Sequence, residues 1–183
     1  MAKLRISGGE LGGRRIEAPP RRGKSDVRPT TEKVREAVFS ILGDVSGAGV
    51  LDLFCGTGAL GLEALSRGAA RATFVDSVPW LAERNAEALG LADRATVVRA
   101  DVFKFLDRAP EHSFDLVLCD PPYGLSQRIS SRLDPLVRRA LAPGGRVIVE
   151  CSPDNPIELE LELVRERGYG DTLVRAYRGP GEV

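Results

Sequence analysis

The 183-residue sequence is poor in the residues that build metal sites, disulfide frameworks and histidine-based catalytic centres. It has a single histidine, His112, and three cysteines, Cys55, Cys119 and Cys151, without a C-x-x-C spacing. An odd number of scattered cysteines argues against a disulfide framework or a zinc site, and one histidine leaves little for a catalytic triad. We therefore expect no metal, and a protein of the reducing cytoplasm.

The sequence also lacks a long apolar run. No segment approaches the roughly 20 apolar residues of a membrane-spanning helix, and the first residues lack the apolar core of a secretory signal. The hydrophobic fraction of 43% and the charged fraction of 28% are ordinary for a globular protein. We expect one domain with a sizeable core and a small appendage, and no membrane contact.

The chain as a whole has no net charge, but its N-terminal segment is basic and the rest is acidic. Residues 1–35 hold ten of the 26 basic residues and four of the 26 acidic ones, so this segment carries +6 and the remainder −6. A basic segment on an acidic body indicates a polyanionic partner such as a nucleic acid, because clustered Lys and Arg side chains neutralise phosphates. The alternative is a solvated segment that only keeps the protein soluble, and charge alone does not decide between the two.

Strand and helix patterns alternate through the middle of the chain. Apolar strands are predicted over residues 50–54, 72–75, 95–99, 114–119 and 145–150, and helices over 59–66, 79–89 and 128–141. Such alternation predicts an α/β fold with a parallel, doubly wound sheet. Before it, residues 3–18 read as a hairpin, and Thr30 or Thr31 caps a helix that ends near Gly43.

The C-terminal segment departs from this alternation. Between Ile157 and Leu163, leucine and isoleucine alternate with glutamate, which predicts a strand. A turn is predicted at 168–171, followed by a returning strand over 172–178. The two strands would complete the sheet as an antiparallel hairpin.

A glycine-rich loop follows the first strand of the alternating region. Residues 52–61 read DLFCGTGALG, with G-x-G-x-x-G between a strand and a helix, and Asp76 follows Gly56 by 20 residues at the end of the next strand. Glycine permits a tight turn and close approach of a ligand, and a carboxylate at Asp76 can accept hydrogen bonds from ribose hydroxyls. Nicotinamide dinucleotides and S-adenosylmethionine both fit this geometry.

Two further aspartates favour S-adenosylmethionine. A carboxylate at Asp52 would repel a pyrophosphate but attract the ammonium and sulfonium charges of S-adenosylmethionine. Asp101 follows the third strand, where its side chain can accept the adenine amino group while the Val102 N–H meets a ring nitrogen. Asp101 can equally be the N-cap of the next helix. A P-loop is excluded, because no Gly-Lys-Ser/Thr follows the glycines.

Asp120-Pro121-Pro122-Tyr123 directly follows the strand over 114–119. The two prolines fix φ and remove two backbone donors, which leaves rigid carbonyl acceptors at the edge of the sheet. The Asp120 carboxylate and the Pro121 carbonyl can bind the hydrogens of an exocyclic amine and draw its lone pair out of conjugation with a base. Tyr123 can stack on that base.

These motifs together resemble the RsmD family of class I S-adenosylmethionine-dependent methyltransferases. The resemblance also covers RISGG at 5–9, GRR at 13–15, RPTTEKVRE at 28–36 and GALGLEALSR at 58–67, and thus nearly the whole chain. It implies a Rossmann-like fold with a mostly parallel seven-stranded sheet, a C-terminal antiparallel hairpin and a small N-terminal hairpin and helix. Residues 1–43 would face RNA, and residues 44–183 would form the methyltransferase domain.

The family methylates the exocyclic N2 amine of one guanine in bacterial 16S ribosomal RNA. The resemblance therefore implies S-adenosyl-L-methionine as cofactor, 16S ribosomal RNA or a 30S assembly particle as partner, a cytoplasmic location and a monomer. It implies a cofactor site of Asp52, Cys55, Gly56, Thr57, Gly58, Asp76, Ser77, Asp101, Val102 and Asp120. It implies a catalytic site of Asp120, Pro121, Pro122 and Tyr123. The implied RNA contacts are Arg5, Arg14, Arg15, Arg28, Thr30, Lys33 and Arg35.

Three other functions remain as alternatives. DNA adenine-N6 and protein-glutamine methyltransferases also use a Pro-Pro-Tyr motif, although asparagine more often precedes it than the aspartate found at Asp120. An NAD-dependent oxidoreductase would leave the Asp-Pro-Pro-Tyr motif and the basic segment without a purpose. A non-catalytic RNA-binding module would have no need of the glycine loop.

Overall fold

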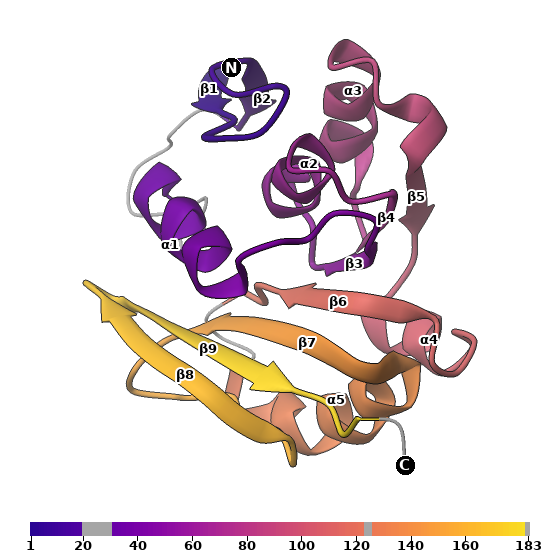
Figure 1. The fold of residues 1–183 in the computed structure, drawn as a ribbon, viewed down its shortest axis with the longest axis vertical. Helices are drawn as coiled ribbons and strands as arrows, with labels where there is room; N and C mark the ends of the chain where they lie inside the picture. The colour runs from indigo at the N-terminus through magenta and orange to yellow at the C-terminus, as the bar shows by residue number, and fades with distance from the viewer. Residues whose placement is uncertain (20–30, 123–125, 182–183) are drawn as a thin grey trace.

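The computed structural model describes residues 1–19, 31–122 and 126–181. In chain order its elements are β1 (Ala2–Arg5), β2 (Arg15–Ala18), α1 (Glu32–Leu42), β3 (Gly49–Leu53), α2 (Ala59–Ser66), β4 (Arg71–Asp76), α3 (Trp80–Ala88), β5 (Ala95–Arg99), α4 (Val102–Leu106), β6 (Phe114–Cys119), α5 (Ser126–Ala140), β7 (Leu141–Cys151), β8 (Glu162–Tyr169) and β9 (Thr172–Arg178). The N-terminal hairpin β1–β2 lies at one end of the molecule and the β8–β9 hairpin toward the other (Figure 1).

The central sheet has seven strands in the order β5-β4-β3-β6-β7-β9-β8. The five strands from β5 to β7 pair in parallel, whereas β9 pairs antiparallel with both β7 and β8. The order reverses between β3 and β6, which places a topological switch point at the carboxyl ends of these strands. The predicted Rossmann-like α/β fold with a C-terminal antiparallel hairpin is confirmed.

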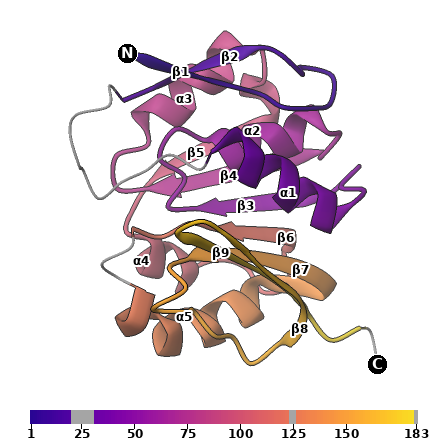
Figure 2. The same ribbon diagram turned by 90° about the vertical axis from the view of Figure 1, so that its left-hand side faces the viewer.

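Helices cover both faces of this sheet (Figure 2). Along β3 the side chains alternate between two hydrophobic clusters, so that Val50 packs with α1, α2 and α3 while Leu51 packs with α4 and α5. All five residues of β3 are buried. A strand covered on both faces needs apolar residues at nearly every position, so Val50, Leu51 and Leu53 are expected there and Asp52 is the exception.

The N-terminal hairpin packs into the same core as the helices α1–α3. Ile6 and Ile16 are buried in the cluster of that face. The buried Glu63 of α2 accepts hydrogen bonds from the backbone N–H groups of Ser7 and Gly8, both at 2.8 Å, and from the Ser7 hydroxyl at 2.7 Å. The segment is therefore docked on the body by apolar burial and by a buried carboxylate.

The predicted helix after the N-terminal segment is confirmed as α1. Thr31 is its N-cap, and the Thr31 hydroxyl accepts a hydrogen bond from the Val34 N–H at 3.3 Å. Thr30, the other candidate cap, lies outside the described residues. Among the described residues, none of the helices has both the length and the apolar character needed to cross a membrane.

The prediction of a strand between Ile157 and Leu163 is wrong for most of its length, since β8 begins only at Glu162. The alternation has another cause: Ile157 and Leu159 are buried in the cluster beneath α5, whereas Glu158 and Glu160 face solvent. Side chains satisfy the backbone here, because Asp134 accepts from the Glu160 N–H at 2.7 Å and Tyr177 donates to the Ile157 carbonyl at 3.0 Å.

Candidate functional site

The carboxyl ends of β3, β4 and β6 meet at one edge of the sheet. Leu53 at the end of β3 lies opposite Val75 on one side and Cys119 on the other. The next residues along β4 and β6 are Asp76 and Asp120, so both aspartates lie beside the loop that follows β3. The sequence-predicted motifs are therefore brought together at the switch point, where open α/β sheets bind ligands.

The glycine loop after β3 forms a tight turn. Gly56 and Gly58 have φ values of +51° and +76°, which L side chains rarely adopt, and Phe54 also has a positive φ of +58°. The loop closes on itself through a hydrogen bond from the Gly58 N–H to the Cys55 carbonyl at 2.7 Å. A Cβ on Gly61 would lie 2.4 Å from Cε1 of Phe74, so only glycine lets α2 approach the sheet this closely.

Asp52 is buried beneath this loop, with 1% of its surface exposed. It accepts a hydrogen bond from the Gly61 N–H at 2.9 Å. Burial raises the pKa of the Asp52 carboxyl to about 7, and the nearby carboxylates of Asp120 and Asp76 also act to raise it. Three acidic groups thus converge on one place, where a cation would stabilise the ionised form of Asp52.

Asp76 is held in place by the loops on both sides of it. One of its carboxylate oxygens accepts from the Gly56 N–H at 3.0 Å and the other from the Val78 N–H at 2.9 Å. A carboxylate has about four acceptor sites, so this arrangement fixes the group and leaves capacity for a ligand hydroxyl. Ser77 follows, and its carbonyl accepts from Nε of Arg99 at 3.2 Å.

Asp101 is the N-cap of α4, the second of the two roles that the sequence allowed. Its Oδ1 accepts from the Lys104 N–H at 3.0 Å, and the side chain is exposed. Val102 begins the helix and its side chain is buried. The cap fixes Asp101 at the end of β5 without using its second oxygen among the described bonds, so a ligand contact remains compatible with it.

The Asp-Pro-Pro segment continues directly from β6. Asp120 is half-buried, Pro121 is buried and Pro122 is exposed, whereas Tyr123 lies outside the described residues. The thiols on either side are unsuited to nucleophilic catalysis, since burial raises the pKa of both Cys55 and Cys119 well above that of an ordinary cysteine. Cys55 packs in the hydrophobic cluster on the α1–α3 face of the sheet, and Cys119 packs in the cluster on the α4–α5 face.

Comparison with known proteins identifies the family. The family described as conserved hypothetical protein 95 matches residues 4–178. The ribosomal RNA small subunit methyltransferase D of Escherichia coli K12 is 34% identical, over 96% of this chain and 90% of its own length. The protein of the same name from Haemophilus influenzae is 29% identical, over 96% and 94%. The chain belongs to the RsmD family.

Solved structures agree with this assignment. The Escherichia coli protein yhhF, provisionally described as a methyltransferase, superposes with a TM-score of 0.83 at 32% identity and covers 99% of this chain and 100% of its own. An RNA methyltransferase from Salinibacter ruber, solved with S-adenosyl-L-homocysteine, has a TM-score of 0.65 at 21% identity over 85% and 96%. The latter shares the fold.

Several of the predicted RNA contacts of this RsmD-family chain lie on the outer face of the N-terminal hairpin. Arg5 and Arg15 are paired directly across β1 and β2, and both are exposed. Like charges opposite one another destabilise a hairpin, and no ion pair within the described ranges neutralises either of them. Arg14 is exposed as well, and Lys33 is exposed on α1.

Arg35 does not fit its predicted role of contacting RNA. Its side chain is fully buried, and one guanidinium nitrogen donates to the Arg5 carbonyl at 2.5 Å. Burial lowers its pKa, and the neighbouring Glu63 carboxylate opposes that shift. Arg35 therefore fixes the hairpin against α1 and α2 and does not reach a phosphate in this conformation. Arg28 lies outside the described residues.

Asn85 on α3 was not singled out from the sequence, although it contacts the glycine loop. Its amide nitrogen donates to the carbonyls of Thr57 at 2.9 Å and Glu17 at 3.0 Å, and its oxygen accepts from the Glu17 N–H at 2.8 Å. One buried side chain thus joins the loop to β2. No motif marks Asn85, because its partners are distant in sequence. Across the described parts of the chain, no group of three or more His, Cys, Asp or Glu residues is placed to hold a metal ion.

Proposed function

We propose that this RsmD-family protein methylates the exocyclic N2 amine of a guanine in bacterial 16S ribosomal RNA, with S-adenosyl-L-methionine as the methyl donor. One observation carries the proposal: the buried Asp52 lies beneath a glycine loop beside Asp76 and Asp120. Three converging carboxylates repel a pyrophosphate and attract a positively charged ligand. This electrostatic arrangement favours S-adenosylmethionine over a nicotinamide dinucleotide.

The residues of the glycine loop fit this cofactor. Asp52, beneath the loop, would attract the ammonium and sulfonium charges, and Asp76 would accept hydrogen bonds from the ribose hydroxyls. Asp101 and Val102 would contact the adenine, while Cys55, Gly56, Thr57, Gly58 and Ser77 complete the walls of the site. When bound, the cofactor supplies a methyl group on a positively charged sulfur. The protein contributes by fixing the charges before the ligand arrives, and the bonds from Gly61 and Gly56 serve that end.

The acceptor base would be held by the segment that follows β6. The target guanine leaves its stack or is already unpaired, because its amine is otherwise out of reach of the cofactor edge. The Asp120 carboxylate and the Pro121 carbonyl accept the two N2 hydrogens, and Tyr123 stacks on the ring while Pro122 stiffens the segment. As the methyl group passes from sulfur to N2, positive charge would develop on N2 and the Asp120 carboxylate would stabilise it; the proton that N2 then loses would go to Asp120 or to water.

The two parts of the chain would have different functions, RNA binding in the first and methyl transfer in the second. Residues 1–43 would engage the RNA backbone through Arg5, Arg14, Arg15 and Lys33, with Arg28 and Thr30 in the connecting segment, and residues 44–183 would carry the cofactor and catalytic residues. The relatives named ribosomal RNA small subunit methyltransferase D support this substrate class. Methyl transfer to free 16S ribosomal RNA and to 30S particles, compared side by side, identifies which of the two is the partner.

The decisive experiment replaces Asp120. Asp120→Ala should lower kcat for methyl transfer on the order of 10²-fold or more, because a carboxylate beside a developing charge is lost. Calorimetric binding of S-adenosylhomocysteine should stay near that of the wild type. Asp107→Ala serves as the control, since Asp107 is an exposed carboxylate whose only described ion pair, with Arg132, spans 3.8 Å.

The substrates are unmodified 16S ribosomal RNA and 30S particles, with labelled methyl donor and mass analysis of the nucleosides. N2-methylguanosine is the expected product, and Asp107→Ala should produce it at the wild-type rate. Wild-type turnover by Asp120→Ala would remove the Asp-Pro-Pro-Tyr motif from the catalytic centre. Methylation of adenine N6 in DNA or of a protein glutamine, with RNA left unmodified, would instead favour the alternative methyltransferase classes.

A further inference from the structure

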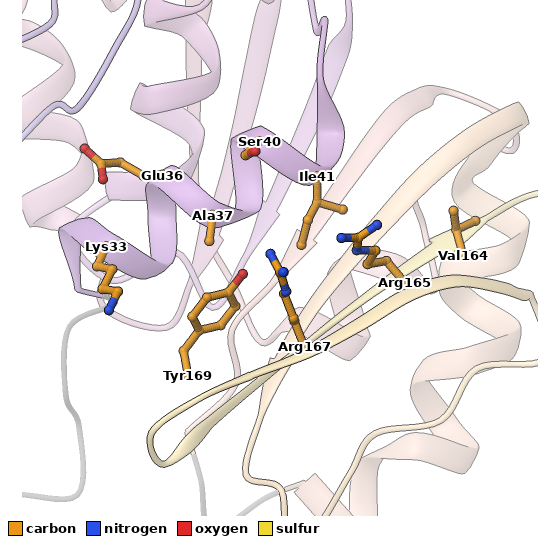
Figure 3. Close-up of a pocket in the computed structure, with 9 residues that line it drawn as sticks. All are labelled: Lys33, Glu36, Ala37, Ser40, Ile41, Val164, Arg165, Arg167 and Tyr169. Carbon is orange, nitrogen blue, oxygen red and sulfur yellow. The ribbon is translucent and has the colours of Figure 1, made fainter.

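A groove separates α1 from the edge strand β8, on the opposite side of α1 from the N-terminal hairpin. It has a volume of about 520 Å³ and is lined by two elements that lie more than a hundred residues apart in the sequence. Figure 3 shows the side chains of Lys33, Arg165, Arg167 and Tyr169 around it. None of the last three was predicted from the sequence to bind a ligand or RNA.

A β-bulge turns the two arginines toward this groove. Leu163 lies opposite Tyr177, whose side chain belongs to the cluster under α4 and α5. The register then shifts at Val164, so that Arg165 lies opposite Ala176, on the face that packs against α1. Without the extra residue, strict alternation would turn Arg165 to the other face of the sheet.

Beyond the bulge, successive side chains of β8 point to opposite faces of the sheet, which separates the basic residues of this stretch from its acidic one. Arg167 lies opposite Val174, and therefore faces α1 as Arg165 does. Glu166 points to the other face, where it forms an ion pair with Arg175 at 2.6 Å. The acidic residue of this stretch is thus neutralised away from the groove, and both arginines are left on the groove side.

The groove is consequently positive and unneutralised. Among the described residues, no ion pair or side-chain hydrogen bond involves Lys33, Arg165 or Arg167, and Glu36 is the single acidic residue in the lining. Arginine and lysine side chains so placed attract a polyanion. Three cations facing one carboxylate give the groove a net charge that the molecule as a whole does not have.

The groove also begins at the cofactor edge of the sheet. Cys151, at the carboxyl end of β7, lies opposite Leu173, which in turn lies opposite Gly168. Tyr169 is the next residue of β8, so its ring and the neighbouring Lys33 mark the end of the groove nearest the site of Asp120. Arg167 and then Arg165 follow at increasing distance from that edge.

We infer that this groove binds the sugar–phosphate backbone of a single-stranded RNA segment that flanks the methylated nucleotide. The inference rests on the proposed function, and adds Arg165, Arg167 and Tyr169 to the RNA-binding surface. Two arginines at i and i+2 on one strand face lie roughly 6.6 Å apart and can contact successive phosphates. An aromatic ring at the catalytic end can stack on a base next to the target.

The test is RNA binding by the Arg165→Gln/Arg167→Gln double variant, measured over a range of salt concentrations. The probes are unmodified transcribed 16S ribosomal RNA and 30S particles. Because the variant cannot neutralise two of the phosphates, the negative slope of log K against log salt should become shallower by about 1.4, at ~0.7 for each single-strand phosphate. Arg108→Gln is the control, because Arg108 is exposed near α4 on the other face of the sheet. It should bind as the wild type does.

The outcomes separate this inference from the proposed function. The groove inference alone fails if the wild type binds and methylates RNA but the double variant has an unchanged salt slope. The cations of the groove would then serve only to keep the edge strand β8 from pairing with other chains. Loss of binding to particles but not to free RNA would point to a ribosomal protein, which also overturns it. If the wild type neither binds nor methylates RNA, the proposed function fails together with the groove. S-adenosylhomocysteine affinity should be equal for all variants and reports folding.

Discussion

At the scale of single residues, Asp52 makes the stability of the unliganded protein depend on pH. Its pKa is raised from 3.8 to about 7 by burial, so the folded state binds more protons than the unfolded chain between these values. The Asp52 contribution to the free energy of unfolding therefore decreases as pH rises from about 4 to 7 and is constant above. A shift of this size corresponds to a loss on the order of 4 kcal/mol.

Asp52→Asn should remove this decrease. The asparagine carbonyl can still accept the hydrogen bond from Gly61, but the side chain no longer titrates. Urea unfolding at a series of pH values from 5 to 8 measures the difference between variant and wild type, which cancels the titration of all other groups. We expect Asp52→Asn to gain stability relative to the wild type as pH rises. Parallel curves for the two proteins would show that Asp52 has an ordinary pKa.

The sequence indicated which aspartates lie at strand ends, but not how they are held. A carboxylate that directly follows an apolar strand is visible in the sequence, so Asp76 and Asp120 could be placed at the edge of the sheet in advance. Asn85 and Glu63 could not, because their partners are fixed only when distant helices and the hairpin pack together. The burial of Arg35 was missed for the same reason: a cation in a basic segment looks exposed until its neighbours, the Arg5 carbonyl and the Glu63 carboxylate, are known.

At the scale of secondary-structure elements, α3 links the N-terminal hairpin to the glycine loop through Asn85. Asn85→Ala should leave the carbonyls of Thr57 and Glu17 and the Glu17 N–H without this partner. Because these groups are only partly buried, the expected total cost is roughly 1–3 kcal/mol, seen as a lower urea midpoint. Weaker S-adenosylhomocysteine binding should accompany it, since Thr57 belongs to the cofactor loop.

Glu87→Ala is the matched control for Asn85→Ala, because Glu87 is an exposed residue of the same helix. It should leave the urea midpoint and the calorimetric affinity unchanged. If Asn85→Ala lowers stability but the affinity of the remaining folded protein equals that of the wild type, the link between hairpin and loop is structural only.

The elements of the alternating region were easier to predict than the C-terminal hairpin. For α2, β5 and β6 the predicted and observed bounds coincide, whereas in the C-terminal hairpin only those of β9 do. These elements carry a hydrophobic period that matches their own geometry. The alternation at Ile157–Leu163 has the period of a strand, yet the segment packs beneath α5 with its backbone bonded to side chains. A period of two shows which side chains are buried, and it does not show that a neighbouring strand is available.

At the scale of the whole molecule, the neutral total charge conceals two basic surfaces on either side of α1. One is the outer face of the hairpin, with Lys3, Arg5 and Arg15, and the other is the groove along β8. The sequence revealed the first as a charge asymmetry in residues 1–35. The second was hidden, because Glu166 lies between Arg165 and Arg167 in the sequence and separates from them only when the strand and its bulge form.

If both surfaces bind the same RNA, their contributions to its salt dependence should add. Lys3→Gln/Arg5→Gln/Arg15→Gln removes three charges and should make the negative slope of log K against log salt shallower by about 2, at ~0.7 for each phosphate neutralised. These side chains are exposed, so the docked core of Ile6 and Ile16 stays intact, as it would not if the hairpin were deleted. When the hairpin and groove substitutions are combined, the change in salt slope should approach the sum of the two separate changes. Distant sites without shared partners in the protein act independently. A combined variant with the slope of either parent would mean that only one surface meets the RNA.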